Sequence, residues 1–193
     1  MYTIVDDLDT RLGACIRIER QRRHWSLTDL AQRSGVSRTM INKVERGEAS
    51  PTAALLGRLS GALGLTLSTL LARIEAIHTG RLSRAKDQLR WTDPATGYVR
   101  RQIAPAPGSD LPLDVVHVEL PGGATVSFPA AAYAFVRQLV WVLDGCLTFI
   151  EGEATHRLGA GDCLELGPSA DCTFRNDQSG PCLYVVMVLK GPQ

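Results

Sequence analysis

The spacing of the apolar residues changes once along this chain of 193 residues, and that change limits the fold more than any other feature. Between about residues 8 and 75, apolar residues recur every three or four positions, as Leu8, Leu12 and Ile16 do, which is the period of amphipathic helices. From about Tyr98 onward, short β-rich runs such as VVHVEL and CLYVVMVL are separated by turn residues. We therefore expect an all-α domain followed by an all-β domain, either a sandwich or a barrel.

The length supports two small domains, because each half is large enough to bury a core of its own. We expect a helical domain over residues 1–75, a linker and lead-in segment over 76–100, and a β domain over 101–193. The boundary lies where RLSRAKDQLRWTDPATGYVRR loses the helical period.

The location of the protein is predicted from what the chain lacks. No stretch approaches the roughly 18 uninterrupted apolar residues of a membrane span, and the start, MYTIVDDLDTR, is acidic where a secretory signal is basic and then apolar. The five cysteines form no C-x-x-C pair, which argues against both a disulfide framework and a zinc ribbon. We expect a cytoplasmic protein with reduced thiols and no membrane partner.

Charge is divided unevenly between the two halves, although the net charge is only +1. Residues 11–46 hold nine Lys/Arg against three Asp/Glu, whereas residues 111–193 hold four against nine. Such a division indicates that the N-terminal part alone meets a polyanion, and nucleic acid is the obvious candidate.

Capping residues divide the helical part into five predicted helices. Ser26 followed by Asp29 forms a capping box that starts the second helix, and Gly35 permits the left-handed turn that ends it. Ser37 caps a third helix, and Ser50-Pro51-Thr52 opens a fourth with a cap followed by proline at its first position. A last short helix is expected around residues 68–74.

The third helix is predicted to enter the major groove of DNA, because two short helices joined by a glycine turn place the second one there. Its core face carries Ile41 and Val44 with Met40 beside them, which leaves the other face uniformly polar. On that face Arg38 can donate bidentately to guanine, Asn42 can pair with adenine, and Thr39 offers a methyl to thymine or a hydroxyl to a base edge.

Contacts to the DNA backbone are expected from residues at the margins of this face. Lys43 and Arg46 lie farther along the helix and are assigned to phosphate. Thr28 starts the second helix, whose N-terminal amides favour an anion. These contacts set the register of the protein on the duplex rather than its sequence preference.

The segment SLTDLAQRSGVSRTMINKVERGEASPTAALLGRLSGALGLTLSTLL resembles the helix-turn-helix of the XRE family, which is related to phage repressors. The resemblance covers roughly residues 8–73 and implies a five-helix, lambda-repressor-like fold. It also implies that Glu45 and Gly47 structure the end of the recognition helix. It places these residues toward DNA: Thr28, Ser37, Arg38, Thr39, Asn42 and Lys43.

A dimer is expected on physical grounds, because one module that reads about four base pairs cannot find a genomic site alone. The double-stranded operator is then an inverted repeat, with half-sites about 34 Å apart or a multiple of that distance.

The β part resembles a cupin, a small double-stranded β-helix, and the likeness is carried by WVLDGCL and LGAGDCLELGPSADCTFRN. Metal-dependent cupins present a His-x-His pair, a Glu and a third His. Here no histidine lies between His117 and His156, Gln138 stands where the resemblance places the Glu, and Cys172 where it places the third His. An amide and one thiol do not make a three-ligand site, so neither a metal nor another cofactor is expected.

A barrel without a metal can still hold a small molecule in its interior, which alternate strand residues line. Arg137 is the residue suited to an anionic ligand, because a guanidinium pairs well with a carboxylate. His117 alternates with two valines and is a candidate for pointing inward. The simpler interpretation of the whole set is ordinary core packing. The candidate pocket residues are His117, Phe128, Tyr133, Arg137, Gln138, Val140, Cys172 and Phe174.

The complete chain resembles the XRE-cupin regulators, in which a DNA-binding head is joined to a small-molecule sensor. We therefore expect a non-enzymatic, homodimeric transcription regulator with a small-molecule effector that no residue identifies. Two alternatives stand beside it. One is a metal-dependent cupin enzyme with a DNA-binding tether, which the missing ligands disfavour; the other is an effector-independent autorepressor whose barrel only dimerises.

Overall fold

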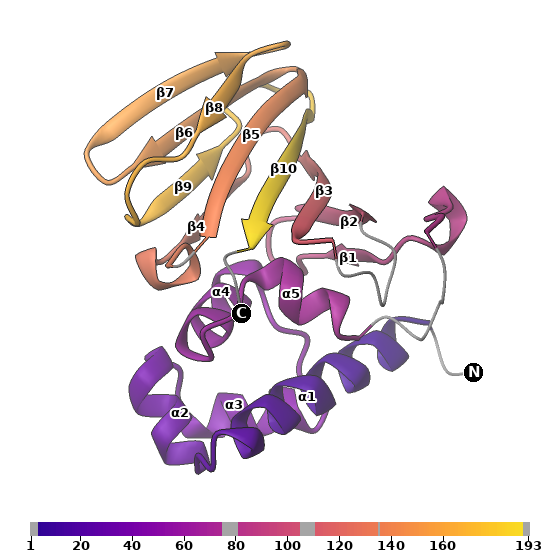
Figure 1. Ribbon diagram of the computed structural model, residues 1–193, viewed down its shortest axis with the longest axis vertical. Coiled ribbons are helices and arrows are strands. Elements are labelled where there is room, and N and C mark those ends of the chain that lie inside the picture. Colours follow the sequence, from indigo (N-terminus) through magenta and orange to yellow (C-terminus); the bar gives the residue numbers. More distant parts are fainter. Residues whose placement is uncertain (1–3, 75–80, 105–110, 135, 191–193) are drawn as a thin grey trace.

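The computed structural model describes residues 4–74, 81–104, 111–134 and 136–190. Within these ranges five α-helices come first and ten strands follow, and Figure 1 shows the helices on one side of the strands. The predicted division into an all-α part and an all-β part is therefore confirmed. None of the helices within the described ranges is long and apolar enough to cross a membrane. The helices are α1 (Ile4–Arg22), α2 (Leu27–Ser34), α3 (Arg38–Glu45), α4 (Ala53–Ala62) and α5 (Leu67–Ala72).

Three of the predicted helix boundaries lie where the sequence places them. The Ser26 side chain accepts a hydrogen bond from the Asp29 amide while the Asp29 side chain accepts one from the Ser26 amide, which is the expected capping box. Gly35 ends α2 in the left-handed conformation, with φ of 66°. Ser37 caps α3 by accepting from the Met40 amide.

The predicted start of the fourth helix was wrong by two residues. Thr52, not Ser50, is the cap of α4, and its side chain accepts a hydrogen bond from the amide of Leu55. Pro51 precedes the cap and is buried, so it is not the first helical residue. The reason is that Ser50 uses its hydroxyl elsewhere, as a donor to the Asp9 carboxylate of α1.

Ten strands form two facing antiparallel sheets. In the six-stranded sheet the order is β1-β2-β3-β10-β5-β8, and in the four-stranded sheet it is β4-β9-β6-β7. Most neighbours are far apart in the chain, which is the jelly-roll arrangement of cupins. The strands are β1 (Arg90–Thr92), β2 (Val99–Ala104), β3 (Leu113–Leu120), β4 (Thr125–Phe128), β5 (Val136–Asp144), β6 (Cys146–Glu151), β7 (Ala154–Gly159), β8 (Cys163–Glu165), β9 (Cys172–Arg175) and β10 (Cys182–Lys190).

The segment over 76–100, expected as linker and lead-in, carries structure of its own. It contains a 3₁₀ turn, η1 (Ala85–Asp87), then β1 and the first residues of β2. β2 pairs with β3, so this segment extends the barrel sheet by two strands. Residues 76–80 lie outside the described ranges.

We call the domain of helices α1–α5 the head and the domain of strands β1–β10 the barrel. The head packs directly on one end of the barrel, and Figure 1 shows α4 and α5 beneath the sheets. The contact is close because α4 carries glycine where the barrel approaches. A Cβ added to Gly57 would lie 2.6 Å from Cδ1 of Phe128, and one added to Gly61 would lie 3.0 Å from the backbone carbon of Ala131. Head and barrel therefore share one continuous apolar core.

Candidate nucleic-acid interface and barrel cavity

Helix α3 has one buried face and one exposed polar face. Ile41 and Val44 are buried in the head core. Met40 differs from the expectation, since its side chain is 38% exposed although the sequence placed it beside the core. It therefore borders the polar face, and its exposure was missed because apolar residues are assigned inward by default.

All seven predicted DNA-binding residues lie on the surface of the head. Arg46 forms the C-cap of α3 and makes an ion pair with Glu48 at 2.7 Å, with both side chains well exposed. Such an exposed pair is weak and can exchange for a phosphate. Thr28 is the second residue of α2. The exposed set is Thr28, Ser37, Arg38, Thr39, Asn42, Lys43 and Arg46.

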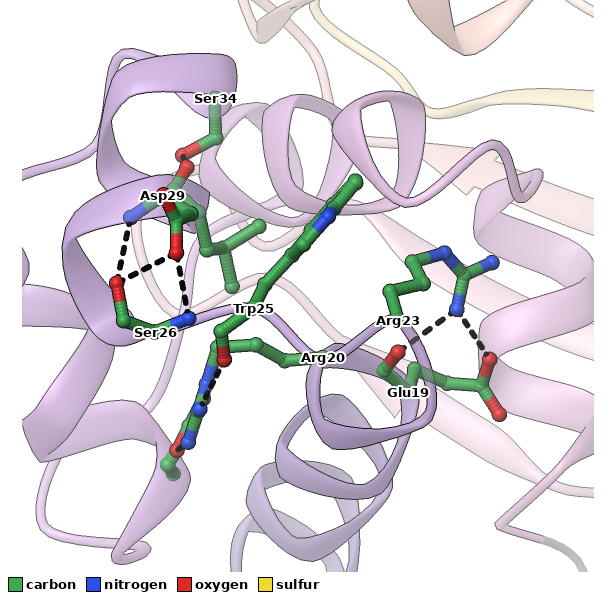
Figure 2. A network of polar contacts seen from close by, with 9 residues as sticks. Glu19, Arg20, Arg23, Trp25, Ser26, Asp29 and Ser34 are labelled. Carbon is green, nitrogen blue, oxygen red and sulfur yellow. Dashed lines mark hydrogen bonds and ion pairs between the residues drawn. The ribbon is translucent and has the colours of Figure 1, made fainter.

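A buried ion pair fixes the C-terminal end of α3 to α1. The Arg20 guanidinium donates from Nε and Nη2 to the two carboxylate oxygens of Glu45, both at 2.7 Å, and from Nη1 to the Trp25 carbonyl at 2.8 Å. The hydrogen bonds to Glu45 raise the pKa of Arg20 above its ordinary value. Because bidentate pairs of this kind have a defined geometry, the pair holds the recognition helix at one angle to α1. Figure 2 shows Arg20 reaching past Trp25 in this network.

A second buried carboxylate, Glu19, gathers basic side chains on the other side of α1. It accepts from Arg22 and Arg23, each at 2.9 Å, and also pairs with Arg73 from the end of α5. Burial alone would raise the pKa of Glu19, but the hydrogen bonds from Arg23 and Arg73 outweigh it and the pKa is lowered. These arginines stabilise the frame of the head, so not every positive charge of residues 11–46 faces DNA.

Ser34 holds the turn between α2 and α3, and a cation–π contact joins α2 to the segment between α1 and α2. The Ser34 hydroxyl donates to the Leu30 carbonyl at 2.6 Å and accepts from the Val36 amide at 3.2 Å. The Arg33 guanidinium lies 4.3 Å from the centre of the Trp25 ring, a favourable cation–π distance. The two helices of the motif are thus tied to each other and to α1.

The barrel interior contains a small cavity at its contact with the head, which we call the inner cavity. Its volume is about 30 Å³, and Phe128, Tyr133, Gln138 and Phe174 border it from the barrel side. Phe128 and Phe174 meet edge to face with ring centres 6.0 Å apart. Four of the predicted pocket residues therefore meet around one space.

A second space, the outer cavity, lies beside the first and opens toward the barrel surface. It measures about 150 Å³ and shares Tyr133 and Gln138 with the inner cavity. Cys172 borders it from β9 and Arg137 borders it from β5. Tyr133 and Gln138 thus form the wall between the two cavities.

Two of the predicted pocket residues face away from the interior, and the prediction of an inward His117 was wrong. On β3 the fully buried positions are even-numbered, from Asp114 to Leu120, so His117 points to the outer face. Arg137 alternates outward on β5, where it pairs with Glu165 and its side chain is 74% exposed, so it reaches only the rim of the outer cavity. Val140 is buried in the core but borders neither cavity.

The donor atoms near the expected metal position do not suit a metal ion. Burial raises the pKa of Cys172 to about 12, so its sulfur is a thiol and donates to the Ala170 carbonyl at 3.4 Å. Burial also raises the pKa of Tyr133 well above its ordinary value. Gln138 is a neutral amide. Among the described residues, no group of three or more His, Cys, Asp and Glu side chains is placed to hold a metal.

The sequence interpretation missed the polar side of the inner cavity. Tyr98 and Arg100 border it from the start of β2 and Ser68 borders it from α5. The alternation of Tyr98, Arg100 and Gln102 was the available signal, since residues two apart on a strand share a face. It was overlooked because this stretch was assigned to the lead-in and the helical segment to the head alone.

Comparison with known proteins supports the same division of the chain. Residues 16–70 match the helix-turn-helix family HTH_3. The chain is 37% identical over 68 residues to the HTH-type transcriptional regulator SutR of Escherichia coli, covering 35% of this chain and 38% of SutR. It is 34% identical over 91 residues to an HTH-type transcriptional regulator of Mycobacterium tuberculosis, covering 47% of this chain and 64% of that protein. The chain thus spans from about a third to under two thirds of these relatives.

One solved structure extends the likeness beyond the head, and a second is reported beside it. The HTH_3 family transcriptional regulator from Vibrio cholerae superimposes with a TM-score of 0.77 at 20% identity, over 96% of this chain and 99% of that one. This likeness shows that the complete fold, head and barrel together, occurs in another protein. The cupin_2 domain of an XRE family regulator from Enterobacter cloacae gives a TM-score of 0.44 at 20% identity, over 50% of this chain and 98% of that domain.

The ImmF control region 10 kDa protein of Bacillus phage phi105 is matched nearly completely. It is 31% identical over 81 residues, which are 42% of this chain and 90% of the phage protein. Together with the HTH_3 match, this similarity confirms the resemblance of the head to phage-type helix-turn-helix proteins. The chain belongs to the XRE-type helix-turn-helix family of transcriptional regulators.

Proposed function

We propose that this protein is a dimeric, sequence-specific DNA-binding transcription regulator whose cupin domain senses a small metabolite. The observation that carries the DNA-binding part is the exposed polar face of α3 on a helix fixed by the buried Arg20–Glu45 pair. Because the helix is already held in one position, its exposed polar side chains can bind base edges with a smaller loss of conformational entropy. The relatives named as transcriptional regulators support the same assignment.

The seven exposed residues divide into two roles. Arg38, Thr39 and Asn42 read base edges in the major groove, because guanidinium and amide groups match the patterns of guanine and adenine. The others, Thr28, Ser37, Lys43 and Arg46, contact phosphate and set the register.

This division is tested by selecting a preferred duplex from random sequences and then measuring affinity by fluorescence anisotropy. Arg38→Ala and Asn42→Ala are expected to lose about 1–3 kcal/mol on the selected duplex and to relax the preference at one position each. Lys43→Ala is expected to weaken all duplexes alike and to reduce the salt dependence. Arg157→Ala, on β7 of the barrel, is the control for loss of a positive charge. Unchanged sequence preference in both base-reading variants would contradict the assignment.

Dimerisation is proposed through the outer face of the barrel sheet. Leu139, Trp141 and Leu143 alternate outward on β5 and are each more than a third exposed, and Leu189 on the neighbouring β10 is 47% exposed. A row of large apolar side chains on one face is typical of a surface that a second copy covers. A dimer of this kind carries two heads for an inverted repeat.

The dimer is tested by light scattering on the purified chain. Trp141→Glu is expected to give a monomer, whereas Leu82→Glu, which changes an exposed leucine outside this face, leaves the dimer intact. Circular dichroism checks that both variants are folded. A dimeric Trp141→Glu protein would exclude this face as the interface.

The sensor role rests on the two adjoining cavities and on the contact of the inner cavity with the head. A ligand that binds there with different affinity for two arrangements of head and barrel changes operator affinity by that difference. The test is a thermal-shift screen of the complete chain against small metabolites. Fluorescence anisotropy then measures whether each metabolite that stabilises the protein changes its affinity for the selected duplex. Operator binding that no metabolite alters would favour the effector-independent autorepressor.

A further inference from the structure

Arg100 is a buried positive charge that lacks a negative partner. The residue is 8% exposed, and its Nη1 and Nη2 donate to the Tyr98 hydroxyl at 2.9 Å and to the Ser68 hydroxyl at 2.6 Å. Its Nε has no hydrogen-bond partner among the described residues. Within the same ranges, no carboxylate lies at ion-pair distance from this guanidinium. Buried guanidinium groups are ordinarily paired, since an isolated charge in an apolar interior is costly.

The groups around Arg100 are neutral as well as buried. Tyr133 and Tyr184 keep their phenolic protons, because burial raises the pKa of both well above the ordinary value. The Tyr184 hydroxyl is itself buried without a hydrogen-bond partner in the described part of the chain. The inner cavity is thus bordered by one cation, Arg100, whose Nε is unsatisfied, and its described lining contains no anionic acceptor.

The apolar side of the inner cavity limits which anion fits. Phe128, Phe174 and Val186 border the same cavity as the guanidinium. One positive charge balances one negative charge, and a second negative charge would lie in an apolar wall. A monocarboxylate with an apolar body meets both conditions.

The place of Arg100 between the two domains gives such a ligand a means of control. Arg100 is on β2 of the barrel, whereas Ser68 is on α5 of the head. The inner cavity of about 30 Å³ holds about one to two water molecules, so a larger ligand must displace a group that now borders the cavity. The adjoining outer cavity of about 150 Å³ has a mixed lining, and its apolar members Val136, Leu166 and Cys172 can contact the end of a short apolar body once Gln138 and Tyr133 move.

We propose that Arg100 binds the carboxylate of a small apolar monocarboxylate and that this carboxylate competes with Ser68 for the guanidinium. Binding breaks the hydrogen bond from the barrel to α5 and releases the head from its present position. The inference rests on the proposed sensor function and adds to it the class of ligand, the residue that recognises it and the contact that transmits binding.

The experiment uses the complete chain with sodium butyrate as the probe and sodium chloride at equal ionic strength as the reference. Calorimetry and thermal shift are expected to detect butyrate binding, with sulfate and succinate much weaker. Arg100→Gln is expected to lose at least about tenfold in butyrate affinity, because the charge-assisted hydrogen bonds are removed. Arg101→Gln, the neighbouring position with its side chain on the outer face, is the matched control and keeps the parent affinity.

The Ser68→Ala variant distinguishes carboxylate binding by Arg100 from a purely structural contact between the two domains. Since it removes the competitor but not the guanidinium, butyrate affinity is expected to rise up to about tenfold. A purely structural Arg100–Ser68 contact predicts lower stability in both variants and no opposite effects on butyrate affinity. Equal effects of the two variants on butyrate affinity would overturn the proposal, even if Arg100→Gln proved poorly folded.

The outcomes distinguish this inference from the proposed function. If the selected duplex binds but no carboxylate stabilises the protein more than chloride, the inference fails and DNA binding stands. If sulfate binds through Arg100 and butyrate does not, the assignment to monocarboxylates is wrong. If no duplex is preferred, the proposed function itself fails, whatever butyrate does.

Discussion

The head and the barrel treat buried charge in opposite ways. In the head, Glu19 and the Arg20–Glu45 pair have partners on every side, and several hydrogen bonds satisfy each carboxylate. In the barrel, the hydrogen bonds of Arg100 to the described residues go to two hydroxyl groups. A closed network of this kind fixes one conformation, whereas an unpaired charge beside a cavity leaves a position for a ligand. The buried charges of the head therefore favour a rigid domain, whereas the buried charge of the barrel favours a domain that a ligand completes.

The first substitution leaves a buried charge of the head without its partner, as Arg100 is in the barrel. Glu45→Ala leaves Arg20 buried without its partner and is expected to lower the free energy of unfolding by about 3–5 kcal/mol. Urea denaturation followed by circular dichroism measures this loss. Glu48→Ala, which removes the exposed partner of Arg46, is the control and should cost less than about 1 kcal/mol. Similar losses in the two variants would mean that burial does not set the strength of these pairs.

The converse change removes the buried positive charge of the barrel. Arg100→Met replaces an unpaired buried cation by an apolar side chain of similar length and is expected to stabilise the ligand-free protein by about 1–4 kcal/mol. The same urea titration measures it. A loss as large as that of Glu45→Ala would instead reveal a negative partner for Arg100 and remove the contrast.

The junction between the two regions is tested by a single methyl group. Gly57→Ala places a Cβ 2.6 Å from the side chain of Phe128, so either the Phe128 ring or α4 must shift, at a cost of about 1–3 kcal/mol. Gly180→Ala is the control, because a Cβ there has no neighbour within 4 Å. Thermal unfolding of both variants gives the result, and an unchanged Gly57→Ala protein would show that head and barrel are not tightly joined.

The smallest expected effect is a difference in pH dependence. The pKa of Glu19 is lowered, so its contribution is complete above pH 4.5 and is lost as the pH falls through the folded-state value. The pKa of Cys172 is raised from 9.0 to about 12, so its contribution is complete below pH 9.0 and is lost as the pH rises toward 12. Each slope is at most about 1.4 kcal/mol per pH unit.

Single substitutions assign the two slopes. Glu19→Gln should flatten the acid side of the stability curve and Cys172→Ala the alkaline side, as measured by urea titrations from pH 3 to 11. A parent and a Cys172→Ala protein with the same alkaline slope would contradict the second assignment.

The parts of the structure that depend on near neighbours in the chain could be predicted from the sequence. The Ser26–Asp29 capping box, the glycine turn at Gly35 and the strands β3 and β5 to β10 follow from local spacing. Thr52 replaced Ser50 as a cap because Asp9, distant in the chain, engages the Ser50 hydroxyl. That competition cannot be seen in a local pattern.

The parts that depend on pairing between distant segments were less accessible. Which face of β3 carries His117 is decided by how its strand packs, and alternation alone does not distinguish inside from outside. Arg100 was missed because its meaning comes from two contacts, one with Ser68 in the head and one with the barrel cavity. The roles of the DNA-facing residues and of the pocket stay predictions.

The glycines of α4 have a consequence for how such regulators can be recombined. Since Gly57 and Gly61 let the barrel rest on the helix backbone itself, the two domains are fitted to each other rather than strung together. If this barrel were fused to a head with larger residues at these two positions, the added side chains would hold α4 away from the barrel and leave a gap between them. A chimeric regulator must therefore take α4 and the barrel surface that contacts it from the same protein. The two domains are then exchanged together, as one unit.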